Sequence, residues 1–161
     1  MAALTSSFIS EISPYRYLAL DTACFIYHFS GQPSYTPLAH ALFSSIETGQ
    51  HSAITSTLTI TEVFTLPEKT ADLFELQAYE QFFLHFPHLD LIPPTYPINR
   101  LAAKLRAQYP SLKTPDALHL GTALYLQADC FITNDKRLKC VKEIPLIILD
   151  SFIPKKSRKT R

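Results

Sequence analysis

The sequence has few of the features that define several large protein classes. Its 161 residues include no tryptophan, three glycines and three cysteines, and no apolar run approaches the about 20 residues that a membrane span needs. The scarcity of glycine and of low-complexity tracts excludes collagen-like and linker-like chains. The odd number of cysteines and the absence of a CxxC pair favour reduced, buried thiols at Cys24, Cys130 and Cys140. We therefore expect a cytoplasmic protein that does not enter a membrane.

Positive charge is scarce except at the end of the chain. Residues 155–161 hold five of the 15 basic side chains, which leaves ten against 14 acidic ones in residues 1–154. The basic surface typical of a general nucleic-acid binder is thus absent from the body of the chain. We divide the sequence into an N-terminal extension (1–16), one folded domain (17–153) and a basic, disordered tail (154–161). The tail either contacts phosphates or serves as a solubilising end.

Short apolar segments alternate with amphipathic ones along the chain. The pattern predicts strands at 17–21, 52–55, 89–92, 130–133 and 145–149. It predicts helices at 22–29, 37–46, 58–66, 71–86, 98–109 and 114–127, with Pro67 ending the third of these. Strands that alternate with helices indicate an α/β fold, in which a mainly parallel sheet of about five strands is covered on both faces.

Four acidic residues are expected at one edge of this sheet. Asp21 and Asp135 directly follow predicted strands, and Asp116 opens a helix in which Thr114 is expected as the N-cap. Glu62 lies about two helical turns beyond the strand 52–55. Because ligands of open parallel sheets bind beyond the carboxyl ends of the strands, these side chains are predicted to converge on one site.

Each acid also has an ordinary structural explanation. Asp21 suits a helix N-cap, Glu62 has capping-box spacing from Thr59, Asp116 suits a helix dipole and Asp135 suits a turn. Convergence would cost about 3 kcal/mol for each carboxylate pair at ~5 Å and an effective dielectric of about 20. A bound Mg²⁺ or Mn²⁺ would offset this repulsion and could activate a water for phosphodiester hydrolysis.

The motifs around these acids occur in a recognisable order. They are Leu20-Asp21-Thr22, Thr61-Glu62-Val63, the run from Thr114-Pro115-Asp116 to Ala123, and Phe131-Ile132-Thr133-Asn134-Asp135-Lys136-Arg137-Leu138. In this order they resemble the PIN-domain family, with the greatest similarity to VapC-type toxins of bacterial toxin–antitoxin pairs. The resemblance implies a three-layer α/β/α sandwich and a Mg²⁺- or Mn²⁺-dependent endoribonuclease.

The resemblance also assigns roles to individual residues. It implies that Asp21 and Asp116 are the principal metal ligands, and that Glu62 and Asp135 bind metal directly or through water. Residues expected to support this catalytic site are Thr22, His119, Thr133 and Asn134, and residues expected to contact RNA are Lys136 and Arg137. The implied partners are an RNA substrate, a small antitoxin and a second copy of the chain.

Other functions would require different features in the sequence. The first is a PIN-like module that binds RNA or a protein without cutting, which would not need clustered carboxylates. A haloacid-dehalogenase-type phosphatase would need an acid at Ala23, a receiver domain would need an acidic pair near the first strand, and a P-loop would need GxxxxGK. None of these three patterns is present in the sequence.

Overall fold

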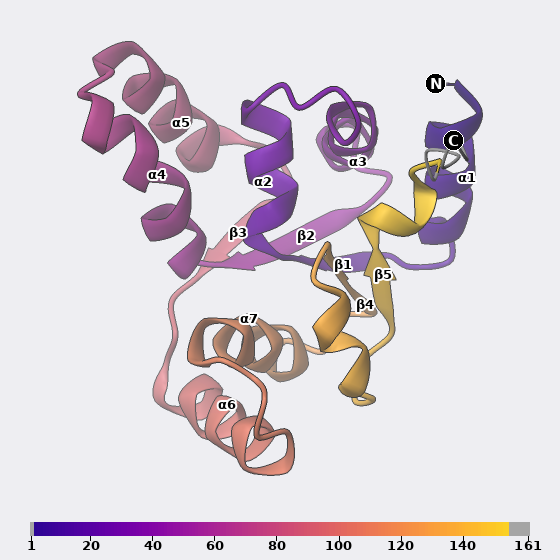
Figure 1. Cartoon of the computed structure of the whole chain (residues 1–161), viewed down its shortest axis with the longest axis vertical. Helices are drawn as coiled ribbons and strands as arrows, with labels where there is room; N and C mark the ends of the chain where they lie inside the picture. Colours follow the sequence, from indigo (N-terminus) through magenta and orange to yellow (C-terminus); the bar gives the residue numbers. More distant parts are fainter. Residues whose placement is uncertain (1, 155–161) are drawn as a thin grey trace, which may run out of the picture.

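The computed structural model describes residues 2–154 and confirms the α/β prediction (Figure 1). Its five strands are β1 (Tyr17–Leu20), β2 (Ser52–Ser56), β3 (Leu89–Ile92), β4 (Cys130–Thr133) and β5 (Leu146–Ile148). They form one sheet in the order β3-β2-β1-β4-β5, and every neighbouring pair is parallel. The carboxyl ends of all the strands therefore lie at one edge.

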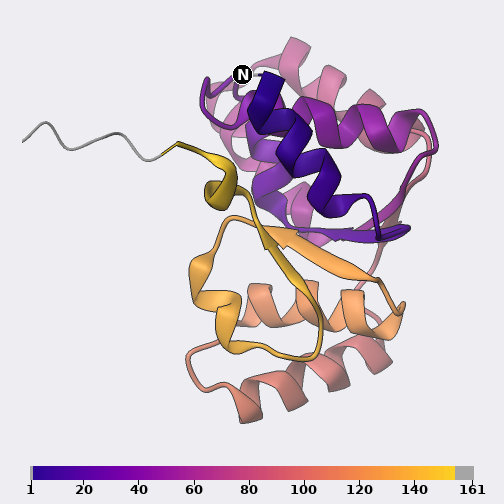
Figure 2. The same cartoon turned by 90° about the vertical axis from the view of Figure 1, so that its right-hand side faces the viewer.

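Helices cover both faces of the sheet. They are α1 (Ala2–Ile12), α2 (Thr22–Phe29), α3 (Thr36–Glu47), α4 (Leu58–Thr70), α5 (Leu73–His85), α6 (Tyr96–Gln108) and α7 (Thr114–Tyr125), with 3-10 turns η1 (Lys136–Cys140) and η2 (Leu149–Phe152). Figures 1 and 2 show α1, α2 and α3 on one face and α6 and α7 on the other. A core of buried side chains lies on each face of the sheet, and alternate residues of β1 point into opposite cores. Leu18 and Leu20 pack toward α1–α3, whereas Ala19 packs toward α6 and α7. The fold is thus a three-layer sandwich.

Helix α7 approaches α6 closely because it carries a glycine at the contact. A Cβ atom added at Gly121 would lie 2.9 Å from the carbonyl oxygen of Ile98 and 3.2 Å from the backbone nitrogen of Ala102. A larger residue would therefore force the two helices apart. This contact fixes α7, whose first turn contains Asp116, against the rest of the domain.

Two local expectations were wrong, and one further helix was not predicted. The unpredicted helix, α1, lies in the N-terminal extension, and its Phe8 and Ile12 are fully buried. The helix α4 continues through Pro67 to Thr70, so this proline lies inside the helix and removes one backbone donor from it. The N-cap of α7 is Lys113, so Thr114 already lies in the first helical turn. The basic residues 155–161 lie outside the described residues.

The burial of the cysteines was predicted correctly for two of the three. Cys24 and Cys130 are buried, whereas Cys140 is exposed at the end of η1, in which only Leu138 is buried. The correction follows from the short 3-10 turn, which directs one side chain in three toward the core. Between residues 2 and 154, no helix is both long and apolar enough to cross a membrane.

His28 of α2 lies within an aromatic cluster between α2, α3 and α5. Its ring centroid is 4.6 Å from that of Phe43 and 5.2 Å from those of Phe82 and His40. Its Nδ1 atom is buried and has no hydrogen-bond partner. Burial, and secondarily the nearby His40, lowers the pKa of His28 to about 4. The folded protein therefore keeps this imidazole neutral at pH values where an unfolded chain would protonate it.

We expect His28→Leu to remove part of the acid sensitivity of folding. A histidine whose folded pKa is depressed contributes stability that is fully present above its unfolded value near 6.5 and is lost as pH falls toward about 4. Partial exposure screens the charge, so the loss should be on the order of 1–2 kcal/mol. Urea unfolding of both proteins at pH 5 and pH 8 measures it. A stability difference between wild type and variant that is the same at both pH values would contradict this expectation.

Candidate active site

Asp21 lies at the end of β1 and caps the N-terminus of α2. Its Oδ1 accepts a hydrogen bond from the backbone N–H of Thr22 at 2.8 Å, and its Oδ2 accepts one from the hydroxyl of Thr133 at the end of β4. Burial raises the pKa of Asp21, and the neighbouring Glu62 carboxylate adds to this effect, while the hydrogen bond from Thr133 and the nearby His119 oppose it. Two neighbouring strands thus fix one carboxylate at the carboxyl edge.

Asp116 lies in the first turn of α7, near enough to Asp21 for the two charges to interact. Its side chain is half-buried. Burial raises the pKa of Asp116, and the charges of Asp21 and Asp135 raise it further, while Arg137 and His119 act in the opposite direction. The charges of Asp21 and Asp135, which follow β1 and β4, therefore act on the carboxylate of Asp116 in α7.

Glu62 approaches the same region from α4. The hydroxyl of Thr22 donates a hydrogen bond to its Oε2, and Nε2 of His119 lies 3.7 Å from that oxygen. The contact with His119 is the main cause of the lowered pKa of Glu62. The Glu62 side chain is still 42% exposed, so it lies at the rim of this group and is open to solvent.

Asp135 follows β4 and is bound by a neighbouring arginine. The Nε atom of Arg137 lies 2.9 Å from both carboxylate oxygens, and the backbone N–H of Arg137 donates to Oδ1 at 2.9 Å. These hydrogen bonds lower the pKa of Asp135. The backbone N–H of Asp135 donates to the hydroxyl of Thr133 at 3.0 Å, so Thr133 links Asp135 to Asp21.

Two of the expected site residues face away from the acids. Asn134 donates to the hydroxyl of Tyr27 at 2.6 Å and accepts from the backbone N–H of Asp150 at 2.8 Å. Lys136 forms an ion pair with Asp150, whose carboxylate also accepts from the hydroxyl of Tyr35 at 2.8 Å. The sequence reasoning missed Asp150, although it directly follows the last predicted strand, as Asp21 and Asp135 follow theirs.

The donor set suits a hard divalent cation held with many waters. Within residues 2–154, no three aspartate, glutamate, histidine or cysteine side chains lie close enough together to hold a metal ion. Glu62, Asp135 and Asp21 each accept a hydrogen bond from another side chain, and the charges of Asp21 and Asp135 both repel Asp116. Magnesium often binds through one or two carboxylates and keeps its other waters. Asp21 and Asp116 fit that requirement, with Glu62 and Asp135 at the flanks.

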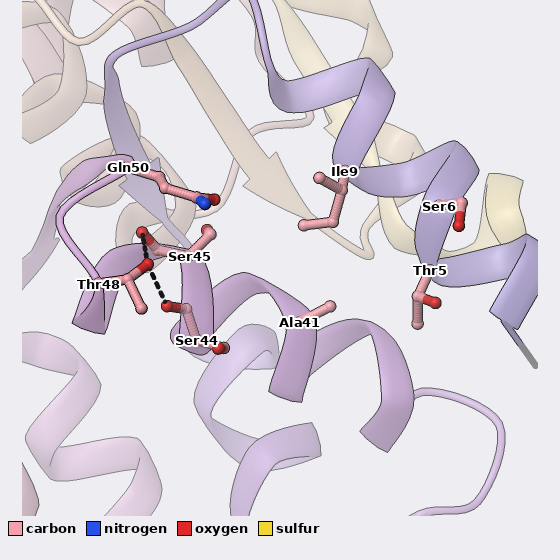
Figure 3. A pocket seen from close by; sticks show the side chains of 8 residues that line it. All are labelled: Thr5, Ser6, Ile9, Ala41, Ser44, Ser45, Thr48 and Gln50. Atoms are coloured by element: carbon pink, nitrogen blue, oxygen red, sulfur yellow. Dashed lines mark hydrogen bonds between the residues drawn. The ribbon is translucent and has the colours of Figure 1, made fainter.

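The larger hollows of the surface lie elsewhere. A cavity of about 380 Å³ lies between α1 and α3, and hydroxyl groups such as those of Thr5, Ser44 and Thr48 line it (Figure 3). No charged side chain lines this cavity, so it offers no chemistry for an ion. A smaller hollow of about 140 Å³ lies between α2, α4 and α5, is lined mainly by apolar side chains, and reaches Glu62. It adjoins the acidic site.

A parallel sheet covered by helices on both faces defines the open α/β proteins, which bind their ligands beyond the carboxyl ends of the strands. The family follows from the sequence, because residues 18–144 match the profile of the PIN domain. The chain therefore belongs to the PIN domain family, and the predicted resemblance is confirmed. The search of curated proteins gave no significant match.

Solved structures of toxin–antitoxin complexes share this fold. A toxin–antitoxin complex from Klebsiella pneumoniae is similar with a TM-score of 0.62 and 22% identity, covering 83% of this chain and 97% of that one. The VapBC2 structure from Rickettsia felis, bound to a promoter DNA fragment, gives 0.65 and 17%, covering 82% and 97%. DNA-bound VapBC from Salmonella typhimurium gives 0.66 and 17%, covering 84% and 98%. At these identities the similarity establishes the fold.

Proposed function

We propose that this protein is a metal-dependent endoribonuclease that hydrolyses RNA phosphodiester bonds and acts in the cytoplasm. The observation that carries the proposal is the contact of one hydroxyl, that of Thr133, with both Asp21 and Asp135 at the carboxyl edge of the sheet. Burial, and secondarily the charges of these two acids, raise the pKa of the half-buried Asp116 at the same edge. Carboxylates that raise one another's pKa repel, and a bound divalent cation would offset this repulsion. Membership of the PIN domain family supports the same conclusion.

The roles of the residues follow from their positions. Asp21 and Asp116 would hold Mg²⁺ or Mn²⁺, and the bound ion supplies Lewis acidity and an activated water for attack on phosphorus. Thr133 orients Asp21 and Asp135 through one hydroxyl. Glu62 is exposed at the rim, where it can accept a proton from water or bind an ion with the substrate present. The exposed Arg137 guanidinium is placed to contact an RNA phosphate.

We further propose that a small antitoxin binds and inhibits this protein, and that the chain forms a homodimer. The structures with the same fold are themselves toxin–antitoxin complexes. An apolar surface beside the site also suits a protein partner, because Ile26 and Leu66 next to the hollow at Glu62 are 43% and 66% exposed. A partner that covers this surface would block access to Glu62.

A second candidate function is a module that binds RNA or a protein without cutting. One observation favours it, namely that no three potential ligands lie at metal-holding distance within residues 2–154. The two candidates differ in their requirement for a metal. A binding module would neither bind Mn²⁺ nor cleave RNA.

A metal titration combined with a cleavage assay tests the proposal. We expect Mn²⁺ to bind and, at ten times its Kd, to stabilise the folded protein by about 1.4 kcal/mol. Single-stranded RNA should be cut in Mg²⁺ or Mn²⁺, spared in EDTA, and cut again when the metal is restored. Calorimetry, thermal unfolding and gel analysis of the RNA measure these outcomes. RNA binding with neither Mn²⁺ binding nor cleavage would support the second candidate.

A further inference from the structure

His119 occupies an unusual position in the helix that carries Asp116. It lies one turn after Asp116, is 3% exposed, and has a buried Nδ1 atom without a hydrogen-bond partner. Its other ring nitrogen, Nε2, lies 3.4 Å from the hydroxyl of Thr22 and 3.7 Å from Oε2 of Glu62. The polar contacts that compensate for burial of this ring are therefore all on the side of Thr22 and Glu62.

The contacts of His119 with Thr22 and Glu62 join the helices α2, α4 and α7 near the acids. Thr22 directly follows Asp21 at the start of α2, Glu62 belongs to α4, and His119 belongs to α7. The Thr22 hydroxyl also lies 3.3 Å from that of Thr59, so the polar contacts continue into the first turns of α4. Glu62 is the most exposed partner in this group, and its side chain would be free to rotate without these contacts.

We propose that His119 is a positioning residue that, together with Thr22, fixes the Glu62 carboxylate at the rim of the Asp21–Asp116 pair. The assignment rests on the proposed metal-dependent function. In this role His119 does not touch the ion or the RNA. It acts through Glu62, so its loss should matter only while Glu62 has a carboxylate to orient.

Glutamine and asparagine at position 119 form a matched pair for the test. The side-chain amide nitrogen of glutamine can occupy the place of Nε2, whereas that of asparagine reaches only about as far as Nδ1. We expect His119→Asn to weaken Mn²⁺ binding about tenfold, as is typical for residues that orient metal ligands, and His119→Gln to stay within about twofold of wild type. Calorimetric titration of the full chain with Mn²⁺ measures both, and thermal unfolding compares their stability.

A double-mutant cycle with Glu62→Gln separates positioning from a general structural effect. We expect His119→Asn to have little further effect on Mn²⁺ binding in the Glu62→Gln protein, because the carboxylate it orients is gone. Independent, additive losses, or equal losses in His119→Asn and His119→Gln, would overturn the assignment while leaving the proposed function intact. A wild-type protein that binds no Mn²⁺ would overturn the proposed function, and this assignment with it.

Discussion

Asp116→Asn should reduce RNA cleavage by at least about 100-fold, because it removes one of the two carboxylates placed to hold the ion. The variant should nevertheless fold. Asparagine keeps the shape of the side chain and removes a charge that Asp21 and Asp135 repel. Loss of cleavage without loss of stability is the combination expected of a functional acid, and not of a residue that caps or supports the fold.

The stability of the metal-free Asp116→Asn protein provides a second measurement. A carboxyl group whose folded pKa is raised contributes stability that is fully present below its unfolded pKa and is lost as pH rises through the folded pKa. Asparagine does not titrate, so the variant does not lose stability in this way as pH rises. In EDTA, its Tm should therefore exceed that of wild type by more at pH 7 than at pH 4. Asp90→Asn is the matched control, since Asp90 is exposed on β3 away from the acidic site. Full, EDTA-sensitive cleavage by Asp116→Asn would refute the assignment.

Much of the fold was predictable because its signals are local. Each strand is a short apolar run, so the predicted strands agree with the observed ones to within about a residue at either end. The positions of Asp21 and Asp135 at one edge were also predictable, since in a parallel sheet the residues that follow neighbouring strands lie at the same edge. Asp116 lies in the first turn of a helix that leads into β4, and its role with these two acids stays a prediction.

The remaining features depend on side-chain contacts between distant segments. The sequence of α1 gives no strong helical pattern, and its place in the core depends on the surface that α3 and η2 offer to Phe8 and Ile12. Likewise, the turn after β4 contains Asn134, Asp135 and Lys136 in succession, but only Asp135 faces the acids. Which residue of such a turn faces inward depends on partners such as Asp150, which are remote in sequence.

Phe25→Ala should produce the largest loss of stability, about 3–5 kcal/mol. Phe25 is fully buried one turn after Asp21, and its ring centroid lies 5.1 Å from that of Phe43 and 5.2 Å from that of Phe83. Truncation leaves a cavity where α2, α3 and α5 meet, and these helices cannot close it without moving the helix that Asp21 caps. For a chain of this size the corresponding decrease in Tm is roughly 6–20 °C.

Phe74→Ala is the matched control for this substitution. Phe74 lies on α5 but is 84% exposed, so its truncation should change stability by less than about 0.5 kcal/mol. Urea denaturation of both variants gives the two free energies of unfolding under one set of conditions. Equal losses in the two variants would mean that Phe25 does not pack as described. A selective loss in Phe25→Ala, accompanied by weaker Mn²⁺ binding in the folded fraction, would indicate that this aromatic cluster also holds Asp21 in place at the edge of the sheet.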